Sequence, residues 1–185
     1  MDNKVCPPWV GYFLLNPLRR LLENPEKILG QFIREGMVVL EPGCGMGFFT
    51  LPMARMVGGN GRVIAVEIQE KMLSVLQRRA LKAGLEDRIE IRQSGADKMG
   101  IEDLSGKVDF SAAIHVIHEV PDQVSFLSEL WSALKPEGEL LAIEPKGHVS
   151  QEEFNQTLTI AEDIGFKSEK MLFKTDGRRA LLHKP

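Results

Sequence analysis

The sequence predicts an α/β fold in which the strands of a mostly parallel sheet alternate with helices along the chain. Residues 37–40 are a continuous apolar run, which is typical of a strand buried on both faces of a parallel sheet. Three glycines at alternate positions follow this run, and residues 48–57 then form an apolar segment of helical length. Most of the later strand-like runs are also followed by a helical segment, which is the pattern of an α/β domain.

The composition is that of a soluble globular protein of ordinary domain size. The chain has 185 residues, of which 43% are hydrophobic and 26% are charged. Its net charge of −3 disfavours broad nucleic-acid binding, and no apolar run approaches the roughly 20 residues that span a bilayer. Cys6 and Cys44 form no disulfide framework and have no metal-type spacing, and no signal peptide is apparent. We therefore expect a cytoplasmic protein without a metal.

Residues 1–36 precede the first predicted strand and are expected to form a helical and aromatic cap segment. Two Asn-Pro pairs each place an asparagine cap before a proline at the first helical position. They predict short helices at residues 18–23 and 26–34. Residues 37–185 form the remainder of what we expect to be a single domain overall.

The elements that follow are predicted from apolar runs and from their stop signals. Gly84 ends one helix, and Ser150 with Glu153 predicts a capping box at the start of another. Residues 135–138 form a turn into a strand, and residues 175–177 carry the Asp-Gly signal of a hairpin. The later strands are predicted at residues 62–67, 85–92, 107–114, 139–143, 168–174 and 178–184, and the later helices at residues 70–83, 123–134 and 149–164.

The glycine turn after the first strand indicates a ligand that lies on the backbone. Gly43, Gly45 and Gly47 remove every Cβ from one side of the turn, beside the N–H groups that open a helix. Glu41 precedes the turn, and its carboxylate would repel a pyrophosphate and attract a cation. The dinucleotide pattern needs a third glycine where this chain has Phe48. The turn therefore favours a cationic ligand over a dinucleotide.

The E-x-G-x-G-x-G pattern of residues 41–47 resembles the first motif of the class I (Rossmann-like) S-adenosylmethionine-dependent methyltransferases. Lys-Pro-x-Gly at residues 135–138 is similar to that family's entry to its fifth strand. The resemblance covers about residues 37–184. It implies a Rossmann-like, doubly wound, seven-stranded and mostly parallel sheet with a C-terminal antiparallel hairpin. It also implies S-adenosyl-L-methionine as cofactor and S-adenosyl-L-homocysteine as product.

The remaining cofactor residues are predicted at the ends of the following strands. Glu67 lies about twenty residues beyond the glycine turn, where a carboxylate can accept both ribose hydroxyls of a nucleoside ligand. The resemblance implies that Ile68 packs on adenine, and that Ala96 flanks the base while Gly95 or Asp97 stands at the usual acidic position. The predicted cofactor-binding residues are Glu41, Gly43, Cys44, Gly45, Gly47, Glu67, Ile68, Gly95, Ala96, Asp97 and His115.

Two histidines after the fourth predicted strand are the catalytic candidates. The resemblance places the end of this strand opposite the methyl group, so His115 or His118 could orient a substrate or accept its proton. The alternative is that both belong to a helix-capping turn. The aromatic residues near the N-terminus either form a lid or pack in the core. The predicted substrate side consists of Trp9, Tyr12, Phe13, Glu144, Lys146 and His148.

The predicted function is methyl transfer from S-adenosylmethionine to a small or medium organic substrate. The Asp/Asn-Pro-Pro-aromatic signature of enzymes that methylate amide or exocyclic amino nitrogens is missing, and two cysteines are too few for arsenite methylation as the resembled family performs it. Two alternatives stay open: an NAD(P)-dependent oxidoreductase, and a non-catalytic protein that binds S-adenosylmethionine or serves as a scaffold. The acceptor and the oligomeric state are left open by the sequence.

Overall fold

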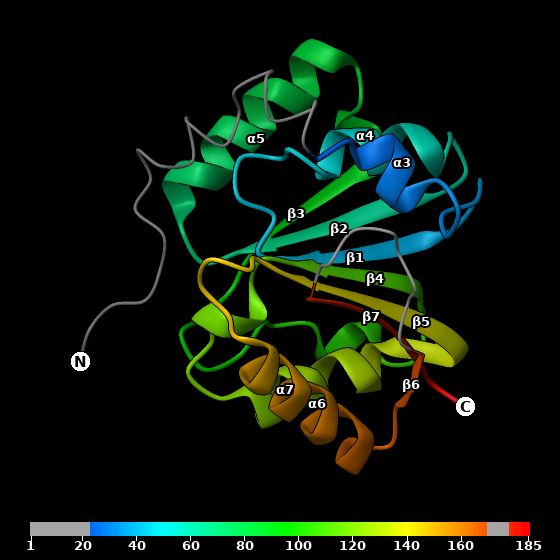
Figure 1. Cartoon of the computed structure of the whole chain (residues 1–185). Helices are drawn as coiled ribbons and strands as arrows, with labels where there is room; N and C mark the ends of the chain where they lie inside the picture. The colour runs from blue at the N-terminus through cyan, green and yellow to red at the C-terminus, as the bar shows by residue number, and fades with distance from the viewer. Residues whose placement is uncertain (1–22, 170–177) are drawn as a thin grey trace. The chain divides into compact units, whose positions relative to one another are not determined.

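The computed structural model describes residues 23–169 and 178–185, and their sheet has seven strands (Figure 1). The chain divides into two compact units, one that ends at Ser94 and one that runs from Gly95 to Pro185. Most of the expected cap segment, with Trp9, Tyr12 and Phe13, lies outside the described residues, and so does the hairpin turn at residues 175–177. The predicted boundary between residues 36 and 37 stays a prediction.

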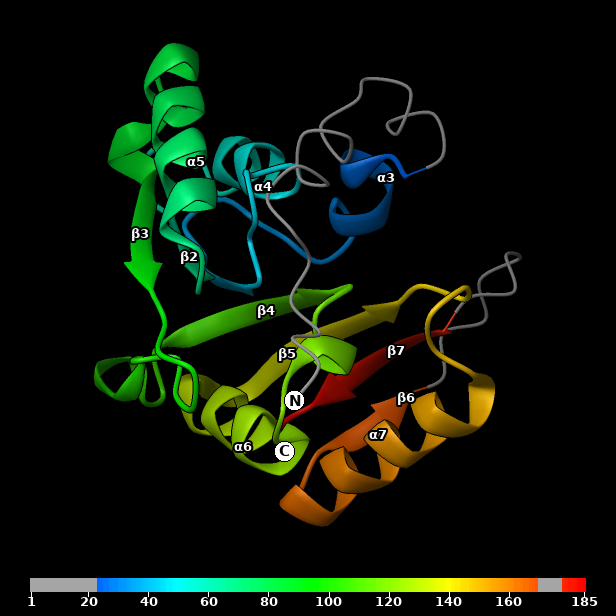
Figure 2. The same ribbon diagram turned by 90° about the vertical axis from the view of Figure 1, so that its left-hand side faces the viewer.

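The first unit is a three-stranded parallel sheet with helices packed against it. Its strands lie in the order β3-β2-β1, and Val63 pairs with Val39 of β1 and with Ile89 of β3. The neighbours Val39 and Leu40 are both buried, so both faces of β1 are covered, as the apolar run predicts. Helices α4 and α5 lie on the same side of these strands in Figures 1 and 2. The elements are α3 (Pro25–Leu29), β1 (Val38–Pro42), α4 (Thr50–Met56), β2 (Arg62–Glu67), α5 (Glu70–Ala83), η1 (Glu86–Arg88) and β3 (Ile89–Gln93).

The second unit contains the parallel pair β4–β5 and the antiparallel strands that close the sheet. Its strands lie in the order β4-β5-β7-β6, and β7 is antiparallel to both of its neighbours. Helices α6 and α7 run side by side against these strands (Figures 1 and 2). The elements are η2 (Glu102–Leu104), β4 (Val108–Ile114), η3 (Ile117–Glu119), α6 (Gln123–Ala133), β5 (Leu134–Glu144), α7 (Gln151–Ile164), β6 (Lys167–Glu169) and β7 (Arg178–His183).

Several elements have the bounds that the sequence predicts. β2 and α5 match to the residue, and Gly84 ends α5 in the left-handed conformation with φ of 64°. The capping box of α7 is present, because the Glu153 N–H donates to Ser150 Oγ at 3.1 Å and the Ser150 N–H donates to Glu153 Oε2 at 2.7 Å. The parallel sheet with an antiparallel closing pair confirms the predicted fold class.

Most of the other predicted boundaries differ by one or two residues, and three differ by four or five. α3 ends at Leu29 instead of residue 34, and the Arg34 guanidinium instead donates to backbone carbonyls of the preceding turn. β3 begins at Ile89 instead of residue 85 because residues 86–88 form a 3₁₀ turn. β5 begins at Leu134 instead of residue 139 because the predicted turn at residues 135–138 lies inside the strand as an irregularity. Leu134 pairs with Val108 of β4, and the regular pairing resumes where Glu139 pairs with Phe110.

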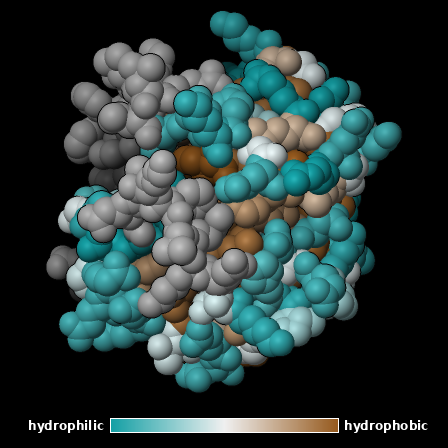
Figure 3. All heavy atoms as spheres, turned by 45° about the vertical axis from the view of Figure 1, so that its right-hand side comes forward, coloured by the Kyte–Doolittle hydropathy of each residue, from teal (hydrophilic) through white to brown (hydrophobic). Residues whose placement is uncertain are grey.

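On the face drawn in Figure 3, hydrophilic side chains dominate among the coloured atoms and hydrophobic ones show in smaller areas between them. Within the part of the chain that the structure describes, no helix is long and apolar enough to cross a membrane.

Candidate active site

The glycine turn of the first unit uses its glycines for two different purposes. A Cβ on Gly47 would lie 2.4 Å from Leu76 Cδ1 and 2.9 Å from Leu51 Cδ1, so this position allows close packing of α4 and α5. A Cβ on Gly45 would meet only Met72 Sδ, at an ordinary 3.7 Å. The backbone at Gly45 is therefore the open part of the turn, and its φ of 53° favours glycine there.

Glu67, at the end of β2, is fixed by the backbone around it. Its Oε2 accepts a hydrogen bond from the Gly45 N–H at 3.1 Å, and its Oε1 accepts one from the Gln69 N–H at 3.0 Å. A carboxylate oxygen can accept two hydrogen bonds, so each oxygen retains capacity for one more donor. The carboxylate is thus oriented by the turn and still suited to a pair of hydroxyls.

Glu41, at the end of β1, is a buried carboxyl group with only 4% of its surface exposed. The Thr50 hydroxyl donates to its Oε2 at 2.5 Å. Burial raises the pKa of Glu41 to about 8; the Thr50 hydrogen bond lowers it and the nearby Glu67 charge raises it. The group therefore holds a proton at neutral pH, and a cation brought beside it would favour its ionised form.

Two further residues of this unit complete the surroundings of the turn. Cys44 is buried, and its burial, together with the charges of Glu41 and Glu67, raises the pKa of its thiol well above the usual range. Ile68, directly after β2, is 36% exposed and provides apolar surface beside Glu67. The Ile68 carbonyl accepts a hydrogen bond from Gln93 Nε2 at 3.2 Å.

In the second unit, the segment expected near adenine is an exposed turn. Gly95, Ala96 and Asp97 are all exposed, and the Gly95 N–H donates to the Lys98 carbonyl at 2.9 Å. A Cβ on Gly95 would have only this carbonyl within reach, at 3.5 Å. These residues stay predictions as cofactor contacts.

His115 lies directly after β4 in an uncommon backbone conformation. Its φ is 58°, in the left-handed region that non-glycine residues rarely adopt. Its N–H donates to the Ile143 carbonyl at 2.7 Å, which fixes the point where the chain leaves the sheet.

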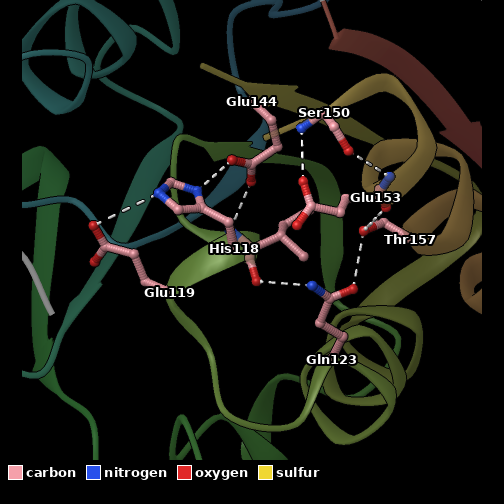
Figure 4. A network of polar contacts seen from close by, with 8 residues as sticks. His118, Glu119, Gln123, Glu144, Ser150, Glu153 and Thr157 are labelled. Atoms are coloured by element: carbon pink, nitrogen blue, oxygen red, sulfur yellow. Dashed lines mark hydrogen bonds and ion pairs between the residues drawn. The ribbon is translucent and has the colours of Figure 1, made fainter. Parts of the chain in front are cut away.

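His118 and Glu144 form a histidine–carboxylate pair (Figure 4). Glu144, at the end of β5, accepts a hydrogen bond from the Ile117 N–H on Oε1 at 2.8 Å, and its Oε2 contacts His118 Nδ1. The His118 Nε2 atom lies 4.0 Å from Glu119 Oε1, on the other side of the ring. The His148 ring is close by, with 5.9 Å between the two ring centroids. The side chain of Glu144 is 2% exposed and that of His118 is 21% exposed, so the imidazole lies between the buried carboxylate and the surface.

The turn that carries His118 is held by α6 and α7. Gln123 Nε2 donates to the Ile117 carbonyl at 3.3 Å, and Gln123 Oε1 accepts from Thr157 Oγ1 at 2.9 Å. The Thr157 hydroxyl also lies 3.2 Å from the Glu153 carbonyl (Figure 4). Gln123 and Thr157 were not among the predicted site residues. The sequence offers one indication of this contact, which is that the polar residue Thr157 lies on the buried, otherwise apolar face of α7.

The other predicted substrate residues lie in the turn after β5. Lys146 and His148 are exposed, and the His148 N–H donates to the Pro145 carbonyl at 3.1 Å. Among the described residues there is no group of three or more His, Cys, Asp or Glu side chains arranged to hold a metal ion.

Comparison with known proteins shows which family this chain belongs to. A demethylmenaquinone methyltransferase of Lactobacillus johnsonii is 29% identical over 112 residues, which is 60% of this chain and 45% of the relative. A ubiquinone/menaquinone biosynthesis C-methyltransferase of Hahella chejuensis is 32% identical over 112 residues, covering 60% of this chain and 44% of the relative. The chain thus spans less than half the length of these curated relatives.

The solved structures cover more of the chain. A SAM-dependent methyltransferase from Aquifex aeolicus is 28% identical with a TM-score of 0.84, over 97% of this chain and 98% of that chain. A SAM-dependent O-methyltransferase from Thermotoga maritima has the same fold, with 20% identity and a TM-score of 0.67 over 88% of this chain and 64% of that chain. The family described as "Methyltransferase domain" matches residues 33–177. The chain therefore belongs to the methyltransferase domain family, in its class I, Rossmann-like and SAM-dependent form.

Proposed function

We propose that this protein transfers the methyl group of S-adenosylmethionine to a small or medium organic acceptor. The observation that carries the proposal is the glycine turn of the first unit, where the open backbone at Gly45 donates to Glu67 and the buried Glu41 carboxyl group lies close to Glu67. Family membership favours this function over a nicotinamide-dependent oxidoreductase.

The residues of the first unit fit the proposed cofactor in their chemistry. Glu67 has acceptor capacity for two ribose hydroxyls, and the exposed Ile68 side chain offers an apolar face for the adenine ring. Glu41 supplies a buried carboxyl group whose ionisation a cationic methionine moiety would stabilise. Gly43, Cys44 and Gly47 shape the turn, and Gly95, Ala96, Asp97 and His115 are the proposed contacts from the second unit.

The bound cofactor supplies an electrophilic methyl group, and the protein has to orient the acceptor and exclude water. We assign the acceptor side to the residues that follow β4 and β5. They are His115, His118, Glu144, Lys146 and His148, with Trp9, Tyr12 and Phe13 as the proposed lid. The curated relatives are named for demethylmenaquinone methylation and for ubiquinone and menaquinone biosynthesis, so demethylmenaquinone is one acceptor to test.

Two measurements test the proposal. Calorimetry should show that S-adenosylhomocysteine binds and that NADH does not, and tight NADH binding would contradict the assignment. A cell extract treated with the protein and methyl-labelled S-adenosylmethionine should then yield a labelled small molecule. Binding without any labelled product would favour the non-catalytic alternative.

A further inference from the structure

We propose that His118 is the general base of the methyl transfer and that Glu144 positions it, so that the acceptor attacks through an acidic hydroxyl such as a phenol. This inference rests on the proposed function, because it names the acceptor class of the same site. It is carried by the histidine–carboxylate pair of the second unit and by the way in which both oxygens of Glu144 are used (Figure 4).

The hydrogen bonds of Glu144 determine which imidazole nitrogen can act. The buried Ile117 N–H donates a hydrogen bond to Glu144 Oε1 at 2.8 Å, and the other carboxylate oxygen, Oε2, contacts His118 Nδ1. An ionised carboxylate can only accept hydrogen bonds, so Nδ1 of the neutral ring has to carry the hydrogen. Nε2 is then the unprotonated nitrogen, and it is the atom able to take a proton from an acceptor.

The charges around the ring favour its protonated form during the transfer. Glu144 lies behind Nδ1, and Glu119 Oε1 is 4.0 Å from Nε2. The other titratable neighbours are His148, whose ring centroid is 5.9 Å away, and Arg178, which stands opposite Glu144 in the pairing of β5 with β7. The two carboxylates stabilise the imidazolium that forms when His118 accepts a proton.

The strength of this base indicates the acceptor class. An imidazole base can deprotonate a phenol, with a pKa of about 10, as the new bond forms, whereas an aliphatic alcohol is far less acidic. The acceptor oxygen forms a bond to the methyl carbon while the sulfonium sulfur takes the electron pair of the bond that breaks. The hydroxyl proton passes to His118 Nε2, so the step is balanced without another reactant.

Nitrogen-15 NMR of histidine-labelled protein tests the base without an acceptor. The His118 ring, identified by its loss in His118→Asn, should be protonated on Nδ1 and unprotonated on Nε2 when neutral. In Glu144→Gln the Ile117 N–H will hold the amide oxygen, so the amide NH₂ faces Nδ1 and should reverse the tautomer. An Nε2-protonated ring in the wild type, or an unchanged tautomer in Glu144→Gln, would overturn the proposal.

Transfer from methyl-labelled S-adenosylmethionine to extract molecules tests the chemistry. His118→Asn should lower the labelling rate at least about 100-fold and Glu144→Gln about 10- to 100-fold, while S-adenosylhomocysteine affinity stays within about twofold in both. Removing the Glu144 charge should also move the acid limb of the rate–pH profile to lower pH. A matched control is His183→Asn, which should not change the rate. His183 also faces a glutamate of β5, with 3.3 Å between its Nδ1 and Glu139 Oε1, but Glu139 lies in the middle of the strand and not at the end that carries Glu144.

The identity of the labelled product decides the acceptor class. A product methylated on a phenolic oxygen supports the proposal, whereas a product methylated on a carbon, an amine, a carboxylate or a thiol contradicts it. If the wild type does not bind S-adenosylhomocysteine, the proposed function fails, and the NMR result still decides whether His118 is built as a base.

Discussion

Replacing Glu41 by glutamine should change how the stability of the protein depends on pH. Glu41 is buried at the end of β1 and hydrogen-bonded to Thr50, and its burial raises its pKa from 4.5 to about 8. The unfolded chain releases this proton near pH 4.5, whereas the folded protein keeps it until about pH 8. Over that interval the folded state binds more protons than the unfolded state, so the free energy of unfolding falls as the pH rises.

The size of this loss follows from the shift. Each pKa unit corresponds to about 1.4 kcal/mol, so the raised pKa of Glu41 makes the fully ionised folded protein roughly 4–5 kcal/mol less stable than the protonated one. This stability is fully present below about pH 4.5 and is lost through pH 8. A glutamine keeps the volume and can accept the Thr50 hydrogen bond, but it has no proton to lose. Its advantage over the wild type should therefore grow by about 1.4 kcal/mol per pH unit.

Urea unfolding of both proteins between pH 5 and pH 9 measures this difference, and the contributions of the other titrating groups cancel. Thr50→Val is an informative second variant, because it removes the hydrogen bond that lowers the Glu41 pKa. The Glu41 pKa should then rise further, so the decline in the free energy of unfolding should continue to higher pH than in the wild type. A difference between wild type and Glu41→Gln that stays constant across this range would refute the reasoning.

Three other predictions concern the glycine turn and its cofactor. Binding of S-adenosylmethionine near pH 7 should release up to one proton from Glu41, and calorimetry in buffers of different ionisation enthalpy measures this release. No release in the wild type, or equal release in Glu41→Gln, would contradict the prediction. Glu67→Gln should weaken S-adenosylhomocysteine binding about tenfold, because an amide lacks the second acceptor oxygen; unchanged affinity would exclude Glu67 as the ribose ligand. Gly47→Ala should lower the free energy of unfolding by about 1–3 kcal/mol, because the added Cβ overlaps the Leu76 side chain. Gly45→Val should instead lose cofactor binding while the protein keeps its secondary structure. Chemical unfolding and titration distinguish the two glycines, and a Gly45→Val variant that binds normally would show that the turn serves packing alone.

The fold was predictable where local patterns and stop signals agree. β2 is a short apolar run that ends in Glu67, and α5 ends at Gly84, so their bounds were correct. β3 was predicted too long because Leu85 is buried and apolar, yet it precedes a 3₁₀ turn instead of pairing. A single apolar residue at a strand boundary does not show whether its backbone is hydrogen-bonded to a neighbouring strand.

The candidate site was predictable as a set of strand ends but not as a set of contacts. The sequence placed Glu144 and His118 after different strands, and their pairing joins residues 26 positions apart. That contact depends on which side chains the helices hold in place, including Gln123 and Thr157, which belong to no sequence motif. The raised pKa of Glu41 likewise depends on burial by distant residues, which a motif does not report.

The burial of Cys44 in the glycine turn has a consequence for the reactivity of its thiol. A thiolate is a strong nucleophile toward an activated methyl group, and Cys44 lies within the turn to which we assign the methyl donor. Burial, together with Glu41 and Glu67, raises the pKa of the thiol and keeps it protonated at neutral pH. Burial is the largest of these causes, so the packing that shapes the glycine turn also holds the Cys44 sulfur in its weakly nucleophilic thiol form.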